Sequence, residues 1–146
     1  MAKIRHIAIA TQTPDETAKF YVDVLGLQEI GKLNNPVVDG YYLTDGTINL
    51  AILHFKTVEV AGMERGKEWS GIHHIGFEVE SLEKNAAKLA AAGSTPRDDI
   101  NRALGLGTAA ASRTGHQEVR YSGPDGVMFD VSPTGWRTAG VRPPAP

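Results

Sequence analysis

Short runs of apolar and β-branched residues alternate along the chain with stretches in which apolar residues recur at helical spacing. Residues 4–10 predict a strand. Thr13 then provides an N-cap, Pro14 suits the first helical position, and Glu16 completes a capping box with Thr13. The helix that begins there carries its apolar residues on one side and is predicted to end at Gly26. The pattern therefore predicts a strand followed by a one-sided surface helix.

Three more β-rich runs follow this helix, at residues 27–33, 40–44 and 47–55. The last two are joined by Asp45-Gly46, a dipeptide that strongly favours a hairpin turn. The first 55 residues are therefore predicted to fold in the order β-α-β-β-β.

The chain then repeats this order at an offset of 68 residues. His6-Ile7-Ala8-Ile9 corresponds to His74-Ile75-Gly76-Phe77, and the helix start at 13–18 corresponds to 81–86. The second copy closes with two β-rich runs, 117–122 and 127–132, around a Gly-Pro-Asp-Gly turn. An internal repeat fixes the architecture, so we predict an α+β fold made of two βαβββ modules.

One domain at residues 1–134 accounts for this pattern, with module one at 1–55, a polar linker at 56–70 and module two at 71–134. Residues 97–115 form an insertion rich in Gly, Ala, Ser and Thr, and we expect it to act as a mobile lid because long loops in compact domains are usually functional or mobile. The proline-rich residues 135–146 are expected to form a loose tail.

Composition narrows the classes of function. A length of 146 residues suits one domain, and the absence of cysteine excludes disulfides, thiolate metal ligands and a cysteine nucleophile. A chain without cysteine also suits a reducing compartment, so we expect the cytoplasm. The net charge of −2, with scattered Lys and Arg, argues against nucleic-acid binding, and no apolar run approaches the length of a membrane span.

Three motifs link the chain to a known family. They are the His-Ile strands at His6 and His74, the phrase FYVDVLGL at 20–27 and the phrase GPDGVMFD at 123–130. With these motifs the sequence resembles the vicinal-oxygen-chelate superfamily, which includes glyoxalase I, methylmalonyl-CoA epimerase, extradiol dioxygenases, fosfomycin-inactivating thiol transferases and bleomycin-binding proteins. The resemblance extends to about Thr134. It implies that both modules share one cup-shaped, curved mixed sheet with helices outside.

The resemblance also implies a metal site. Such proteins hold the metal by a His on the first strand of each module and a carboxylate, usually Glu, on the last strand, and these positions fall on His6, His74 and Asp130. Imidazole nitrogen and carboxylate oxygen suit borderline divalent ions. One His on an apolar strand would be an ordinary core residue, but two at equivalent repeat positions together with a buried acid, which needs a partner, favour metal binding.

Module one departs from part of the family. Glyoxalases and epimerases place a fourth ligand, Glu or Gln, where this chain has Ala51, so we expect three protein ligands and open positions for water or substrate. Asn49 could substitute if the register is shifted by two. His73 should face away from the cup because successive strand side chains alternate. His54 and His116 are expected at the surface.

Other cup residues follow from strand alternation. On the strand at 117–122, Glu118 and Arg120 fall on the cup side, as a candidate base and as a clamp for an anion or enolate; the alternative is a solvated strand face. One of Tyr41 and Tyr42 should line the cup. We assign Tyr41, together with Asn49 and Ala51, to substrate binding.

These expectations describe a metal-dependent enzyme, with one divalent ion per site (Fe²⁺, Mn²⁺, Zn²⁺ or Ni²⁺), acting on a small oxygenated metabolite or xenobiotic. The reaction classes are lyase or isomerase, extradiol-type dioxygenase and thiol transferase. The alternative is a metal-free protein that sequesters a ligand, as bleomycin-binding relatives do, although those lack the histidines. Relatives of this size imply a homodimer, with the site inside one chain or shared between two.

Overall fold

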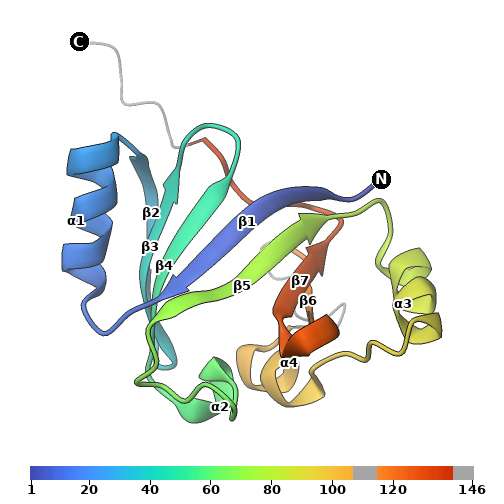
Figure 1. Cartoon of the computed structure of the whole chain (residues 1–146). Helices are drawn as coiled ribbons and strands as arrows, with labels where there is room; N and C mark the ends of the chain where they lie inside the picture. The colour runs from blue at the N-terminus through green and yellow to red at the C-terminus, as the bar shows by residue number, and fades with distance from the viewer. Residues whose placement is uncertain (107–114, 140–146) are drawn as a thin grey trace.

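The computed structural model describes residues 1–106 and 115–139, and these form one curved mixed sheet with helices around it (Figure 1). Module one runs β1 (Lys3–Ala10), α1 (Pro14–Leu25), β2 (Gln28–Asn34), β3 (Val38–Thr44) and β4 (Asn49–Phe55). The short helix α2 (Val58–Ala61) lies in the linker. Module two runs β5 (Gly71–Glu78), α3 (Leu82–Ala91), α4 (Asp98–Leu104), β6 (Val119–Ser122), the 3-10 turn η2 (Pro124–Gly126) and β7 (Met128–Ser132).

The sheet order β2-β3-β4-β1-β5-β7-β6 joins the two modules through their first strands. β1 runs parallel to β4, β5 runs parallel to β7, and β1 pairs with β5 antiparallel in the middle. Figure 1 shows β1 and β5 side by side, with α1 outside module one. The α+β cup of two repeated units is therefore confirmed, and the strands that begin the two repeats are neighbours.

Helix α1 has the bounds that the sequence predicts, but the predicted capping box is wrong, because the Thr13 side chain makes no cap hydrogen bond. It begins at Pro14 and ends before Gly26, which adopts the left-handed conformation at φ 76°. Its buried face packs Ala18 on Leu43 and Ile52, on the outer side of the sheet. The inner side carries a second apolar cluster around Ala8, Ala51, Leu53, Phe55 and Val60. No helix in the described ranges is long and apolar enough to cross a membrane.

The expectation of a mobile lid is wrong for residues 97–106, because Asp98–Leu104 form helix α4. Ile100 is fully buried, and Asp98 and Asp99 lie in the first turn, where acidic side chains stabilise a helix. α4 packs on α2 and β6 and occupies the place where the repeat predicts a strand; an isolated bridge between Pro96 and Tyr121 is the remaining strand pairing there. The rest of the expected lid, at 107–114, lies outside the described residues.

Close approach of β1 and β5 requires a glycine at position 76. A Cβ built there would lie 2.6 Å from the Cβ of His6 and 2.7 Å from the ring of Trp136, distances that real contacts do not reach. The corresponding position of β1 in the first repeat is Ala8. The two modules therefore differ at Gly76, where the ring of Trp136 lies over the strand.

We predict that Gly76→Ala destabilises the fold by about 1–3 kcal/mol, the usual effect of overpacking a closed site. Thermal unfolding followed by circular dichroism measures the change. Gly31→Ala is the matched control, because the nearest atom to its added Cβ is the end of the flexible Arg137 side chain at 3.3 Å. Equal melting temperatures for the two variants would contradict the close approach.

Candidate metal site

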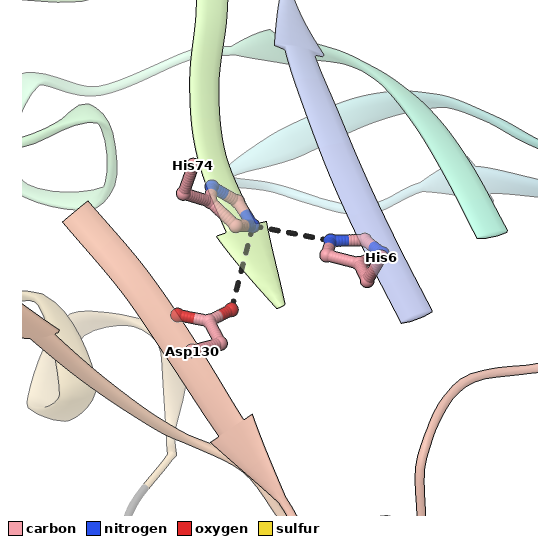
Figure 2. Close-up of side chains that lie close together, drawn as sticks. All are labelled: His6, His74 and Asp130. Atoms are coloured by element: carbon pink, nitrogen blue, oxygen red, sulfur yellow. Dashed lines mark hydrogen bonds and ion pairs between the residues drawn. The ribbon is translucent and has the colours of Figure 1, made fainter. Parts of the chain in front are cut away.

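Three side chains from neighbouring strands converge inside the cup. His6 on β1, His74 on β5 and Asp130 on β7 are all buried, and Figure 2 shows them pointing at a common position. His6 Nε2 lies 3.2 Å from His74 Nε2, which lies 3.4 Å from Asp130 Oδ2. Ligands bound to one metal at about 2.0–2.1 Å stand roughly 3.0–3.4 Å apart, so these two distances suit a shared ion, and all three ligand atoms lie within 4.8 Å of one another. All three come from one chain.

The tautomer of His6 is set by Asn49, its cross-strand neighbour on β4. Asn49 Nδ2 donates to the carbonyl of Arg137 at 2.9 Å, which fixes the amide so that Oδ1 faces His6. His6 Nδ1 therefore donates to Asn49 Oδ1 at 2.8 Å. Burial lowers the pKa of His6 to about 4, so the ring is neutral near pH 7. His6 Nε2 consequently presents a bare lone pair to the site.

A bulge in β5 places His73 within hydrogen-bond distance of His74. Ala8 pairs with His74 but Ile9 pairs with Ile72, so His73 is an extra residue in the strand. The bulge breaks the alternation and turns His73 inward, where it contacts Phe55. The expectation that His73 faces away from the cup is therefore wrong.

This partner sets the tautomer of His74. His73 Nε2 donates to the carbonyl of Ala61 at 2.6 Å, and burial lowers the pKa of His73 to about 4, so its Nδ1 carries no proton. His74 Nδ1 must then donate to His73 Nδ1 at 2.9 Å. Burial also lowers the pKa of His74, so its Nε2 is bare. Two imidazole nitrogens without protons thus lie 3.2 Å apart, and the lone pair of His74 Nε2 accepts a hydrogen bond from Arg120 at 3.0 Å.

Lone pairs this close in a buried site repel each other, and the N–H of Arg120 offsets this repulsion only at His74. No donor in the described ranges reaches His6 Nε2, whose one polar neighbour there is His74 Nε2. A neutral imidazole pair with a carboxylate is the donor set of many divalent metal sites. On this chemistry, His6, His74 and Asp130 fit a bound metal ion.

Arg120 supplies the positive charge that balances Asp130. From β6, Arg120 Nε donates to Asp130 Oδ1 at 2.7 Å, and Nη2 donates to Oδ2 at 2.9 Å and to His74 Nε2 at 3.0 Å. Burial raises the pKa of Asp130 to about 7, and the charge of Arg120 opposes that rise. Because His74 Nε2 has one lone pair, it can bind either Arg120 or a metal ion, so the guanidinium competes with the metal for this ligand.

Glu118, expected to be a base, lies next to the cup and is held by two neighbours. It accepts a hydrogen bond from Trp136 Nε1 at 3.1 Å and pairs with His116 Nε2 at 3.4 Å. Burial alone would raise its pKa, but the hydrogen bond with His116 and the charge of Arg120 lower it to about 2. The same hydrogen bond raises the pKa of His116. Half-buried rather than exposed at the surface, His116 forms an acid–base pair with Glu118.

The start of the segment expected to be a loose tail also contributes to the site. Trp136 stacks on His6 with ring centroids 4.8 Å apart, and the carbonyl of Arg137 holds Asn49. The expectation therefore fails for residues 135–137, because an indole ring provides apolar surface that the surrounding prolines and small residues lack. Residues 140–146 lie outside the described part of the chain. In the sequence, Trp136 was the residue that indicated packing of this segment, and the proline-rich composition around it obscured that indication.

The remaining predicted contacts divide between the two faces of the sheet. Tyr41 is on the outer face, where its hydroxyl donates to Asp15 of α1, so its assignment to substrate binding is wrong. Tyr42 pairs with Ala51 across β3 and β4, and both line the inner cavity. Asn49 reaches His6 and also borders an outer groove of about 700 Å³.

The inner cavity has a volume of about 200 Å³ and is bordered by His6 and His74, two of the three candidate ligands, whereas Asp130 does not line it. Its polar wall carries His6, His74, Glu118 and Arg120, and its apolar wall carries Leu33, Val38, Leu53, Phe55 and Leu104. Trp136 borders both this cavity and the outer groove. The cavity is smaller than the roughly 300–1,000 Å³ of typical ligand pockets, so it suits a small molecule.

A cup of repeated modules with two histidines and an acid on neighbouring strands defines a class of proteins, and comparison with known proteins identifies that class. The model of the Glyoxalase/Bleomycin resistance protein/Dioxygenase superfamily matches residues 3–131, so the chain belongs to this superfamily. Human mitochondrial methylmalonyl-CoA epimerase is 30% identical over 91 residues, which are 60% of this chain and 51% of that protein. The chain thus matches about half the length of this curated relative.

Solved structures share the fold. A hypothetical protein from Bacillus halodurans C-125 superposes with a TM-score of 0.68 at 24% identity, over 90% of this chain and 93% of that one. A variant of Streptomyces coelicolor methylmalonyl-CoA epimerase, in complex with 2-nitronate-propionyl-CoA, gives 0.63 at 24% identity, over 89% and 92%. At these identities the likeness establishes the fold alone.

We predict that His73→Phe weakens metal binding by roughly 10–100-fold although it removes no ligand, because the partner that fixes the His74 tautomer is lost. His73→Asn should recover part of the affinity, since its side-chain oxygen can accept from His74 Nδ1. Competition with a chromophoric chelator measures the affinity. The control is His54→Phe, a substitution on β4 that touches none of the three ligands. Equal metal affinities for the two Phe variants would contradict the role of His73 in fixing the His74 tautomer.

Proposed function

We propose that the chain is a divalent-metal-dependent enzyme that moves a proton next to an oxygen of a small oxygenated substrate. The observation that carries the proposal is the pair of bare imidazole nitrogens of His6 and His74, converging with a carboxylate oxygen of Asp130. Three protein ligands leave positions open for substrate oxygens. The bound metal would supply Lewis-acid stabilisation of the negative charge that develops on such an oxygen.

The residues around the cavity support a proton-transfer role. His116, whose pKa is raised by the Glu118 carboxylate, can donate a proton near neutral pH, whereas the low pKa of Glu118 makes that carboxylate a weak base and suits it to holding His116 protonated. Trp136 covers His6 and separates the inner cavity from the outer groove. Similarity to methylmalonyl-CoA epimerase supports an isomerase-type reaction among the classes open to the superfamily. Methylmalonyl-CoA is therefore the first substrate to assay, by exchange of its α-hydrogen with deuterated water.

A metal-free ligand-binding protein is the second candidate, and Arg120 is the observation that favours it. Its guanidinium already satisfies Asp130 and one lone pair of His74, so the polar groups of the site are partly paired without an ion. The two candidates differ in whether the wild-type protein binds a metal tightly.

We expect wild-type protein purified without chelator to hold about one divalent ion per chain, measured by elemental analysis. His6→Ala, His74→Ala and Asp130→Asn should each remove most of the bound metal while the far-ultraviolet circular dichroism spectrum is kept. Asp130→Asn is chosen over alanine because the amide still accepts from the buried Arg120. His54→Ala serves as the control. Full occupancy in His74→Ala would reject the ligand set, and a wild type that binds none of Fe²⁺, Mn²⁺, Zn²⁺ and Ni²⁺ would favour the binding protein.

We also expect a homodimer in which each chain holds a complete site, because His6, His74 and Asp130 meet within one chain. Mixing His6→Ala with His74→Ala chains should then leave metal content as low as in either variant alone. Light scattering after size-exclusion chromatography gives the mass in solution. A monomeric mass would reject the dimer, and recovered metal content in the mixture would require sites shared between chains.

A further inference from the structure

The proposed function leaves one group beside the cavity without a role, the outer edge of the Arg120 guanidinium. Arg120 is 3% exposed, and its Nη1 has no hydrogen-bond partner within the described part of the chain. A buried donor without an acceptor is unfavourable, which favours a ligand that brings an acceptor to this edge.

Arg120 is held too firmly to turn away from the cavity. Its side chain pairs through two nitrogens with Asp130. Its backbone is clasped by Asn101 of α4, whose Oδ1 accepts from the Arg120 N–H at 2.8 Å and whose Nδ2 donates to the Arg120 carbonyl at 3.0 Å. The unpaired edge therefore keeps a fixed position beside the candidate ligands.

Metal binding would free a second donor on the same edge. Nη2 now donates to both Asp130 and the His74 lone pair, and a metal ion on that lone pair would release the second of these hydrogen bonds. Nη1 and Nη2 would then offer two parallel N–H groups, the fork that binds a carboxylate in bidentate fashion. A neutral carbonyl oxygen or a thioether cannot use both.

We infer that the substrate is a small oxygenated carboxylic acid with a short apolar chain, and that Arg120 binds its carboxylate. This inference rests on the proposed function and names the substrate class of the same site. The cavity is also lined by apolar side chains, those of Leu33, Val38, Leu53, Phe55 and Leu104, which suit a few carbon atoms. The volume of about 200 Å³ limits the part of the ligand inside the cavity to metabolite size.

A matched pair of probes tests the inference. 2-Oxobutanoate and 2,3-pentanedione both carry two neighbouring oxygens and an ethyl group, but only the first has a carboxylate. Binding of each to metal-loaded protein is measured by isothermal titration calorimetry, and metal content is determined in every sample. We expect the acid to bind wild type at least tenfold tighter than the diketone, about 1.4 kcal/mol.

Arg120→Lys keeps a positive charge beside Asp130 but removes the fork, and we expect it to bring the two affinities within about threefold by weakening the acid alone. Arg97→Lys is the control, because Arg97 is also fixed by carboxylates, those of Glu64 and Asp99, and does not line the cavity. Its acid preference should equal that of wild type.

Equal affinities of wild type for the two probes, no binding of either, or an acid preference that survives in Arg120→Lys would overturn the inference. Failure of the proposed function has a different signature. If wild-type protein holds no metal yet still prefers the acid, and loses that preference in Arg120→Lys, the metal-dependent function fails while the carboxylate site stands.

Discussion

The buried carboxylate of Asp130 is the group on which the rest of the site depends. An unpaired charge at that depth would be very costly, so the fold must bring a cation to it. Arg120 is that cation, and its backbone is held by Asn101 from α4. The helix at 98–104 is therefore part of the support of the site, which explains why this segment packs against β6 and α2.

The lone pairs of His6 and His74 depend on a layer of residues outside the ligand set. Asn49 orients one ring and His73 the other, and each is anchored in turn by a backbone carbonyl, of Arg137 and of Ala61. These anchors come from the C-terminal segment and from the linker helix α2, both outside the repeated strands. The repeat thus supplies the ligands, and the segments that break the repeat decide which nitrogen of each ring faces the site.

Arg120 links the two functional candidates in one set of contacts. It pairs with both Asp130 and His74, and a metal ion on His74 would release the second contact and leave an edge for the proposed substrate anion. A guanidinium cannot lose its proton near neutral pH, so the site keeps one fixed positive charge in either state. The charge available to stabilise an anion is consequently built into the chain and does not depend on the metal alone.

Local signals in the sequence were sufficient for the first helix, the hairpin and the repeated strands, but not for helices α2 and α4, and the candidate ligands were assigned through the resemblance to the superfamily. Thr13-Pro14 and Gly26 bound the first helix, Asp45-Gly46 marks the hairpin, and the repeat pairs His6 with His74. These features follow from capping, turn chemistry and strand periodicity, which act over a few residues, so they can be read without a fold.

Contacts between distant segments were decided only by the tertiary structure. The bulge that turns His73 inward depends on how β5 is paired with β1, and a period-two pattern cannot reveal an extra residue. Tyr42 rather than Tyr41 lines the cavity because pairing with Ala51 sets the face of β3. Trp136 lies 130 residues from His6 in the chain, and nothing local to either residue encodes their stacking. The sequence determined which groups could form a site, whereas packing determined their tautomers, charges and exposed edges, because these depend on neighbours that only the folded chain brings together.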